Sequence, residues 1–196
     1  YRSNMDEELH MSKSLYRGMT VIELMVVIAI VAILASLALP SFRDYIEKSR
    51  LRGAVDSVAG LMAMARAEAV RQDRQVAVAF GGTTTAWCFG ANVAAAPAAV
   101  GDRVPDAVAC DCSAPATCSV GAVSSTSFSG VTVTSVSAAA VISPKLGTTI
   151  GLTNQDFGFR SPGDRFQLNT RITPLGHVRS CRPSTAGLIS GFEVCP

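Results

Sequence analysis

The chain has 196 residues, of which 48% are hydrophobic and 16% charged, and its formal net charge is +2 at pH 7. This length allows one domain with appendages, and so small a net charge is no argument by itself for a nucleic-acid partner. Only two histidines are present, and one of them, His10, lies within the first ten residues. A multi-histidine metal site in the rest of the chain is therefore not expected.

The first feature along the chain is an apolar run, residues 19–39, which is interrupted by a single charge, Glu23. As a helix these 21 residues extend about 31 Å, which matches the hydrocarbon core of a membrane. A carboxylate in such a helix costs roughly 2.5–3.5 kcal/mol at the middle of the bilayer. Three interpretations compete: a secretory signal, a signal anchor, and a leader that is removed after Gly18 while the helix is retained.

The third interpretation explains the position of Glu23. Cleavage after Gly18 would place a free α-amine on Met19, and residues four apart face the same side of a helix. The carboxylate can then pair with that amine, or with the amine of a neighbouring subunit, which reduces the cost of burying either charge. A lone glutamate near a helix start can also reach the headgroups, but the combination of Gly18, Glu23 and Pro40 favours the leader.

The stretch RGMTVIELMVVIAIVAILASLALPSF resembles the class III signal and first helix of type IV pilins and pseudopilins. In that family a prepilin peptidase cuts after the glycine, here Gly18, and methylates the new terminus, here Met19, where phenylalanine is commoner. The resemblance assigns Glu23 to subunit assembly. It also assigns to Pro40 a helix kink, which need not end the helix.

Beyond Pro40, apolar residues recur at steps of three and four, which predicts an amphipathic helix to about Arg71. The expected core stripe is Leu51, Ala54, Val55, Val58, Leu61, Met62, Ala65 and Ala69. Met62 and Met64 are both interpreted as core filler. The solvated side is expected to hold Arg50, Arg52, Asp56, Arg66 and Arg74.

After residue 74 the apolar period changes to two, which indicates strands. Turns are expected at Gly81–Gly82 and at 173–176, and an irregular loop is expected over 91–125. Strands are expected within residues 75–80, 85–93, 126–136, 165–173 and 177–182, with a last edge strand at 191–195. The fold class is therefore α+β, with a long N-terminal helix, transmembrane and then amphipathic, packed on a C-terminal antiparallel β-sheet.

All six cysteines follow the apolar run, and an even number beyond a membrane anchor indicates disulfides in an oxidising space. They place the carboxyl side in the periplasm, whereas the positive residues, three before the run and four soon after it, do not decide the orientation. Cys181 and Cys195 are expected to pair. The other four allow three pairings among which the sequence does not choose, with a zinc site as the rival interpretation: Cys88, Cys110, Cys112 and Cys118.

This layout, together with the stretches FGFRSPGDRF, LGHVRSC and GFEVC, resembles the GspH/FimT family of minor pilins and pseudopilins, which have the pilin fold. The resemblance implies a single-pass inner-membrane protein that joins a pilus or pseudopilus near its tip. The organisation it implies is a prepilin leader peptide (1–18), a transmembrane and filament-core helix (19–40), an amphipathic half-helix (41–74) and a periplasmic β-rich domain with a disulfide-bonded loop (75–196).

The partners implied are other pilins or pseudopilins, the prepilin peptidase and the inner membrane. No cofactor, metal or small-molecule substrate is expected, and no catalytic motif is recognised, so the chain is not expected to be an enzyme. Two alternatives to a minor pilin that primes pilus assembly stay open: a type II secretion pseudopilin, and a DNA receptor for natural transformation.

In the FimT branch a carboxyl-terminal G-R-x-R motif is linked to DNA binding, and it falls here on residues 176–179, with His177 in place of the first arginine. On a strand, His177 and Arg179 face the same way, whereas Arg182 alternates to the opposite face. Arginines could hold phosphates weakly and in a salt-sensitive way. They could equally be solvated or paired with Asp156 and Asp164. The candidate DNA-contacting residues are Arg179, His177, Arg182 and Arg171.

Overall fold

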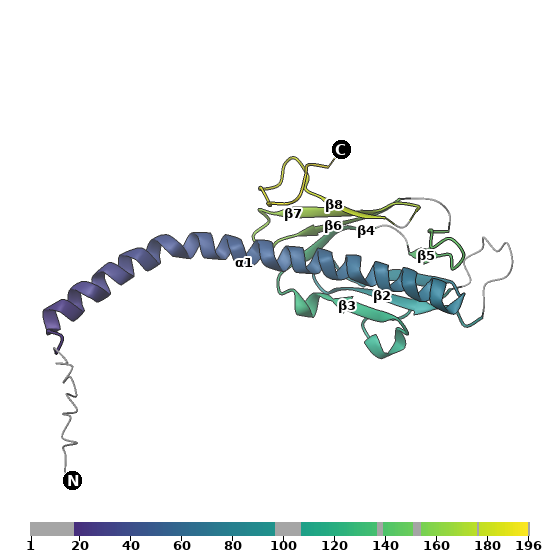
Figure 1. Cartoon of the computed structure of the whole chain (residues 1–196), viewed down its shortest axis with the longest axis horizontal. Coiled ribbons are helices and arrows are strands. Elements are labelled where there is room, and N and C mark those ends of the chain that lie inside the picture. Colours follow the sequence, from purple (N-terminus) through teal and green to yellow (C-terminus); the bar gives the residue numbers. More distant parts are fainter. Residues whose placement is uncertain (1–17, 97–106, 137–138, 151–153, 176, 196) are drawn as a thin grey trace, which may run out of the picture. The chain divides into compact units, whose positions relative to one another are not determined.

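The structure is a computed structural model that describes residues 18–96, 107–136, 139–150, 154–175 and 177–195, without the side chains of residues 38 and 40. The chain divides into two compact units, Tyr1–Phe42 and Arg43–Pro196. Helix α1, Val21–Gln72, begins in the first unit and ends in the second (Figure 1). The predicted leader, apart from Gly18, lies outside the described residues.

In the first unit, the described residues form the start of α1. The helix is capped by Thr20, whose Oγ1 accepts a hydrogen bond from the backbone N–H of Glu23 at 3.2 Å. Threonine followed three residues later by glutamate is the capping-box pattern. Large apolar side chains on all faces are exposed, from 41% at Val27 to 76% at Val21. A helix that is apolar all round is suited to burial in a membrane or among other helices.

Among the described helices, none is both long and apolar enough to cross a membrane as one uninterrupted span. The segments Val21–Leu37 and Ser41–Gln72 meet both requirements when they are taken together, by length and composition only. Pro40 lies between the two, and the kink expected there stays a prediction.

In the second unit, α1 packs on the strands through the predicted stripe. All eight stripe residues are buried, and the helix ends at Gln72, one residue beyond the expected end. Met62 is 5% exposed, as expected of core filler, but Met64 is 53% exposed, so that part of the prediction is wrong. Two residues along a helix turn by about 200°, which places Met64 on the face opposite the core.

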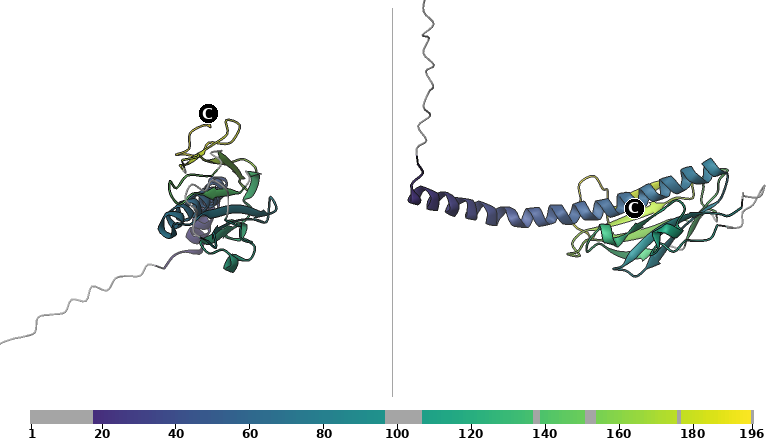
Figure 2. Two further views of the ribbon diagram at one scale, coloured as in Figure 1. Left: turned by 90° about the vertical axis from the view of Figure 1, so that its right-hand side faces the viewer. Right: turned by 90° about the horizontal axis from the view of Figure 1, so that it is seen from below.

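The strands form two four-stranded antiparallel sheets rather than the single sheet expected. Figure 2 shows that the part of α1 in the second unit lies on one side of the strands. Sheet A has the order β3-β2-β1-β5: β1 Val76–Gly82, β2 Trp87–Val93, β3 Gly121–Ser124 and β5 Ala140–Ile142. Sheet B has the order β4-β6-β7-β8: β4 Thr132–Val136, β6 Gln155–Arg160, β7 Gln167–Ile172 and β8 Val178–Cys181.

Two local predictions are corrected by the strands. Gly81 and Gly82 continue β1, and the hairpin turn follows them, where Thr83 N–H donates to the Ala86 carbonyl at 3.1 Å. The expected edge strand at 191–195 is reduced to one parallel bridge between Arg182 and Val194. Two single 3₁₀ turns, Pro115–Thr117 and Ser125–Ser127, complete the described elements.

One hydrophobic core lies between α1 and the inner faces of both sheets. Its aromatic centre is Trp87 and Phe89 from β2 with Phe157 and Phe159 from β6, whose ring centroids lie 5.2–6.0 Å apart where they contact. Trp87 also donates its Nε1–H to the carbonyl of Val131 at 2.8 Å. The shared core and this bond hold the two sheets against one helix as a single body.

Disulfides hold the outer face of sheet A and the carboxyl end. Cys88 pairs with Cys112, Cys110 with Cys118, and Cys181 with Cys195, the last as predicted. The zinc interpretation of the first four cysteines is therefore wrong. Gly90 of β2 makes room for the loop, because a Cβ there would lie 2.6 Å from the sulfur of Cys110 and 2.8 Å from that of Cys118.

Candidate functional site

The start of α1 carries the predicted processing and assembly residues. Gly18 has no atoms within 4 Å of where a Cβ would be, and Met19 is 60% exposed. Because Thr20 caps the helix, Met19 lies one residue before the cap, and the expected helical i, i+4 relation to Glu23 does not hold. Glu23 is exposed, and its carboxylate has no ion pair in the described part of the chain.

The outer face of sheet B holds the candidate DNA-contacting residues. Arg171 of β7 lies directly opposite Arg179 of β8, and Asp156 of β6 lies opposite Arg171 on its other side. Arg171 Nε is 2.7 Å from Asp156 Oδ1, and this hydrogen bond raises the pKa of Arg171. Like charges placed opposite each other repel across a sheet, and the pairing with Asp156 offsets that repulsion.

The other candidate residues, Arg179, His177 and Arg182, differ in exposure and in their contacts. Arg179 is exposed, and its side chain makes no hydrogen bond or ion pair with the described residues. His177 is exposed, and its backbone N–H donates to Thr173 Oγ1 at 3.2 Å. Arg182 is half-buried, its backbone N–H donates to the carbonyl of Glu193, and its Nε is buried without a partner. The structure thus brings Arg171 and Arg179 together, and separates Arg182 from them.

Sequence reasoning missed a charged cluster where the second unit begins. Arg165 Nη2 lies 2.6 Å from Asp44 Oδ1 and 3.2 Å from Glu47 Oε1, and Ser161 Oγ donates to Glu47 Oε2 at 3.2 Å. Hydrogen bonds to Glu47 and then Asp44 raise the pKa of Arg165. The local signal was the three-residue spacing of the two acids; their partner lies more than 100 residues away.

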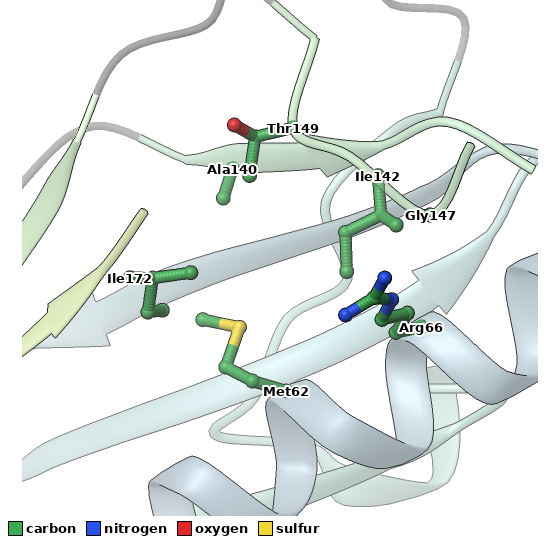
Figure 3. Close-up of a pocket in the computed structure, with 7 residues that line it drawn as sticks. All are labelled: Met62, Arg66, Ala140, Ile142, Gly147, Thr149 and Ile172. Carbon is green, nitrogen blue, oxygen red and sulfur yellow. The ribbon is translucent and has the colours of Figure 1, made fainter. Parts of the chain in front are cut away.

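A small cavity lies between α1, β5 and β7. Figure 3 shows Met62 and Arg66 of the helix facing Ala140 and Ile142 of β5. Its free volume is about 10 Å³, which is room for one water molecule. The described residues also contain no group of three or more His, Cys, Asp or Glu that could hold a metal.

Helix α1 begins with apolar side chains on all faces, and its second part packs on two antiparallel sheets that carry disulfide-bonded loops. This architecture defines a pilin-like α+β protein. Residues 13–39 match the prokaryotic N-terminal methylation motif, and residues 54–176 match the family Type II transport protein GspH. Because the second match covers more than half of the sequence, the chain belongs to the GspH family. It is therefore a type IV pilin-like structural subunit and not an enzyme.

The chain is also similar to fimbrial proteins over a limited length. It is 46% identical over 50 residues to the fimbrial protein EcpC of Eikenella corrodens, which covers 26% of this chain and 33% of EcpC. It is 49% identical over 49 residues to the type IV major fimbrial protein FimA of Dichelobacter nodosus, covering 25% of this chain and 31% of FimA. The chain thus spans about a third of the length of these curated relatives.

Among solved structures, the type IV minor pilin FimU of Pseudomonas aeruginosa PAO1 is similar to the chain. The sequence identity is 15% and the TM-score 0.46, with 70% of this chain and 100% of the FimU chain covered. The α+β fold class itself is confirmed by the arrangement of α1 and the two sheets described above.

Proposed function

We propose that the chain is a minor pilin of a type IV pilus, stored in the inner membrane by one helix and incorporated at or near the filament tip. The observation that carries this proposal is the exposure of apolar side chains on every face of α1 before residue 43. At roughly 25 cal/mol per Å² of apolar surface, such a helix is stable only in lipid or against other helices. A filament core built from neighbouring helices provides the second of these environments.

The domain organisation follows from the same helix. Prepilin peptidase would remove residues 1–18 after Gly18 and methylate Met19, leaving residues 19–40 as the membrane and filament-core helix. Residues 41–74 join that helix to the globular domain, residues 75–196. Three disulfides support a periplasmic location for this domain, because such bonds persist in oxidising compartments.

Glu23 would fix the position of the subunit in the filament. Its exposed carboxylate would pair with the α-amine of Met19 in a neighbouring subunit, and buried charge pairs are best documented as setting register between helices. Glu23→Gln keeps the size of the side chain and removes its charge. We expect the variant to be processed normally at Gly18, to fold, and to be lost from sheared pili; normal incorporation would refute this role.

A mass spectrum of the mature protein tests the whole scheme. We expect an N-terminus at methylated Met19 and six cysteines in three disulfides. A mature protein that begins near Leu39, or that retains residue 1, would refute the retained helix.

The second candidate is a pseudopilin of a type II secretion system, which the match to the GspH family favours. The disulfide-closed loop supports the pilus instead, because we expect fewer cysteines in the secretion branch. A deletion strain separates the two: loss of surface pili with normal protein secretion supports the pilus, and the reverse result supports the pseudopilin.

A third candidate is contact with DNA during uptake, and the exposed side chain of Arg179 beside Arg171 favours it. Arg171 is already paired with Asp156, so the free positive charge on this face rests on Arg179. A gel-shift assay should therefore show weak, salt-sensitive binding that Arg179→Ala reduces. Binding unchanged in this variant would remove the proposed role, and Arg182→Ala provides the matched control on the other face.

A further inference from the structure

The residues that open the second unit form a cationic collar, which we define as Arg43, Lys48, Arg50 and Arg52. They directly follow the apolar segment in the sequence. We infer that the collar docks the globular unit on the anionic headgroups of the membrane while the subunit is stored there. This inference rests on the membrane storage proposed above.

The positive charges of the collar are held in place by neutral groups. Lys48 Nζ lies 4.6 Å from the centroid of the Phe166 ring. Arg50 Nη1 donates to the carbonyl of Ser129 at 3.4 Å, and Arg52 Nη2 donates to that of Ser190 at 2.5 Å. A carbonyl or an aromatic ring orients a cation without cancelling its charge.

The acidic residues of the same region share one cation. Both Asp44 and Glu47 contact Arg165, so one guanidinium forms ion pairs with two carboxylates. Arg43 is exposed and makes no ion pair with the described residues. The four cations of the collar minus these two acids leave a net charge of +2 within the first three helical turns of the unit, and Arg165 raises the local charge to +3.

The depth of the collar matches the headgroup layer. Counted from Val21, where α1 begins, a helix reaches about 30 Å at residue 41, so the residues that follow enter the polar layer, which is roughly 6 Å thick. Tyr45 is 69% exposed there, and tyrosine is enriched at membrane interfaces. Arginine and lysine further along the helix can reach back to phosphates through their long side chains.

Lysine labelling tests the inference, because the chain from Met19 onward contains only Lys48 and Lys145. Lys145 is exposed and lies outside the collar, so it serves as an internal control. The mature chain is placed in nanodiscs of phosphatidylcholine alone, or of phosphatidylcholine with 30% phosphatidylglycerol, and acetylated with an amine-reactive ester. The labelling rate of each lysine is read by mass spectrometry.

We expect acetylation of Lys48 to be about three-fold slower in anionic discs, because a headgroup phosphate covers the amine. High salt should remove the difference, and Lys145 should react equally in both discs. The ring of Phe166 slows acetylation of Lys48 equally in both lipids, so its effect cancels in the ratio of the two labelling rates. The double variant Arg43→Gln with Arg50→Gln should lose the lipid dependence of Lys48.

The matched control, Arg71→Gln with Arg74→Gln, removes two positive charges outside the collar and should keep the lipid dependence of Lys48. Equal Lys48 rates in the two lipids, in a chain that co-purifies with both discs, would overturn only this inference. A chain that co-purifies with neither disc would overturn the membrane storage and the docking together. An equal effect of both double variants would also overturn the collar, because it would show a response to total charge.

Discussion

Replacing Trp87 with phenylalanine tests how the two sheets are joined. Trp87 is 1% exposed, and its Nε1–H is bonded to the carbonyl of Val131, the residue directly before β4. The indole stacks on Phe128 at a centroid distance of 6.1 Å and meets Phe159 edge to face at 5.6 Å. Because β2 belongs to sheet A and β4 to sheet B, the substitution removes a hydrogen bond between the sheets and leaves an apolar ring in place.

The expected loss has two parts. The smaller ring leaves a void of roughly 35 Å³, which costs about 1 kcal/mol at about 24 cal/mol per Å³. The carbonyl of Val131 is left buried without its donor, which costs about 1–3 kcal/mol. We therefore expect Trp87→Phe to lower the free energy of unfolding by about 2–4 kcal/mol, and the melting temperature by roughly 5–12 °C.

The assay is urea and thermal unfolding of residues 43–196 with the disulfides intact, because this unit contains the whole buried core. Phe128→Leu is the control: it removes the stacked ring but keeps the hydrogen bond, and about 1 kcal/mol is expected. A loss below 1 kcal/mol for Trp87→Phe, or one no larger than that of the control, would refute the reasoning.

Two further predictions concern the disulfide loop and acid stability. Gly90→Ala would place a Cβ 2.6 Å and 2.8 Å from the sulfurs of Cys110 and Cys118, so we expect free thiols by mass spectrometry. A hydrogen bond from Arg71 lowers the pKa of Glu68 from 4.5 to about 2. The ionised Glu68 therefore contributes its full stabilisation above pH 4.5 and loses it as the pH falls towards 2. The difference in unfolding free energy between the wild type and Glu68→Gln should shrink over that range. A difference that stays constant with pH contradicts this prediction.

Gly60→Ala is the matched control for the loop prediction. A Cβ at this helical position has no atom within 4 Å, so all three disulfides should form. The helix should gain up to about 1 kcal/mol from the better helix former. If Gly90→Ala also forms three disulfides, the close approach of the loop to β2 is not required for their closure.

The helical part of the fold could be predicted because its signal is local. The stripe from Leu51 to Ala69 repeats with the period of a helix, and every member of it is buried. The strands with strong alternation or turn signals, β1, β2, β7 and β8, were predicted near their observed bounds. The missed strands are β3, β5 and β6. Strands β3 and β5 have only four and three residues, and β6 pairs with both β4 and β7, so tertiary contacts determine them.

For the candidate site, the sequence names residues but not their arrangement. Arg171 and Arg179 become neighbours only through the register of β7 with β8, which the sequence does not encode in any local pattern. The pairing of Arg171 with Asp156 was one of the two alternatives considered, and the structure contains it. The contact of Arg165 with Glu47 joins residues 118 positions apart, and only the folded chain reveals it.

The division into two units has a consequence for assembly. Among the described residues, no buried hydrophobic side chain precedes Leu51, so the core of the second unit needs nothing from residues 19–39. Under the proposed function, the apolar helix start would therefore exchange lipid for neighbouring helices without unfolding the globular unit. Conservative substitutions in the apolar run should change storage and incorporation while the unfolding midpoint of the second unit stays constant. Under the proposed function, such a subunit would leave the membrane at the cost of its lipid contacts alone, and new helix contacts in the filament would offset that loss.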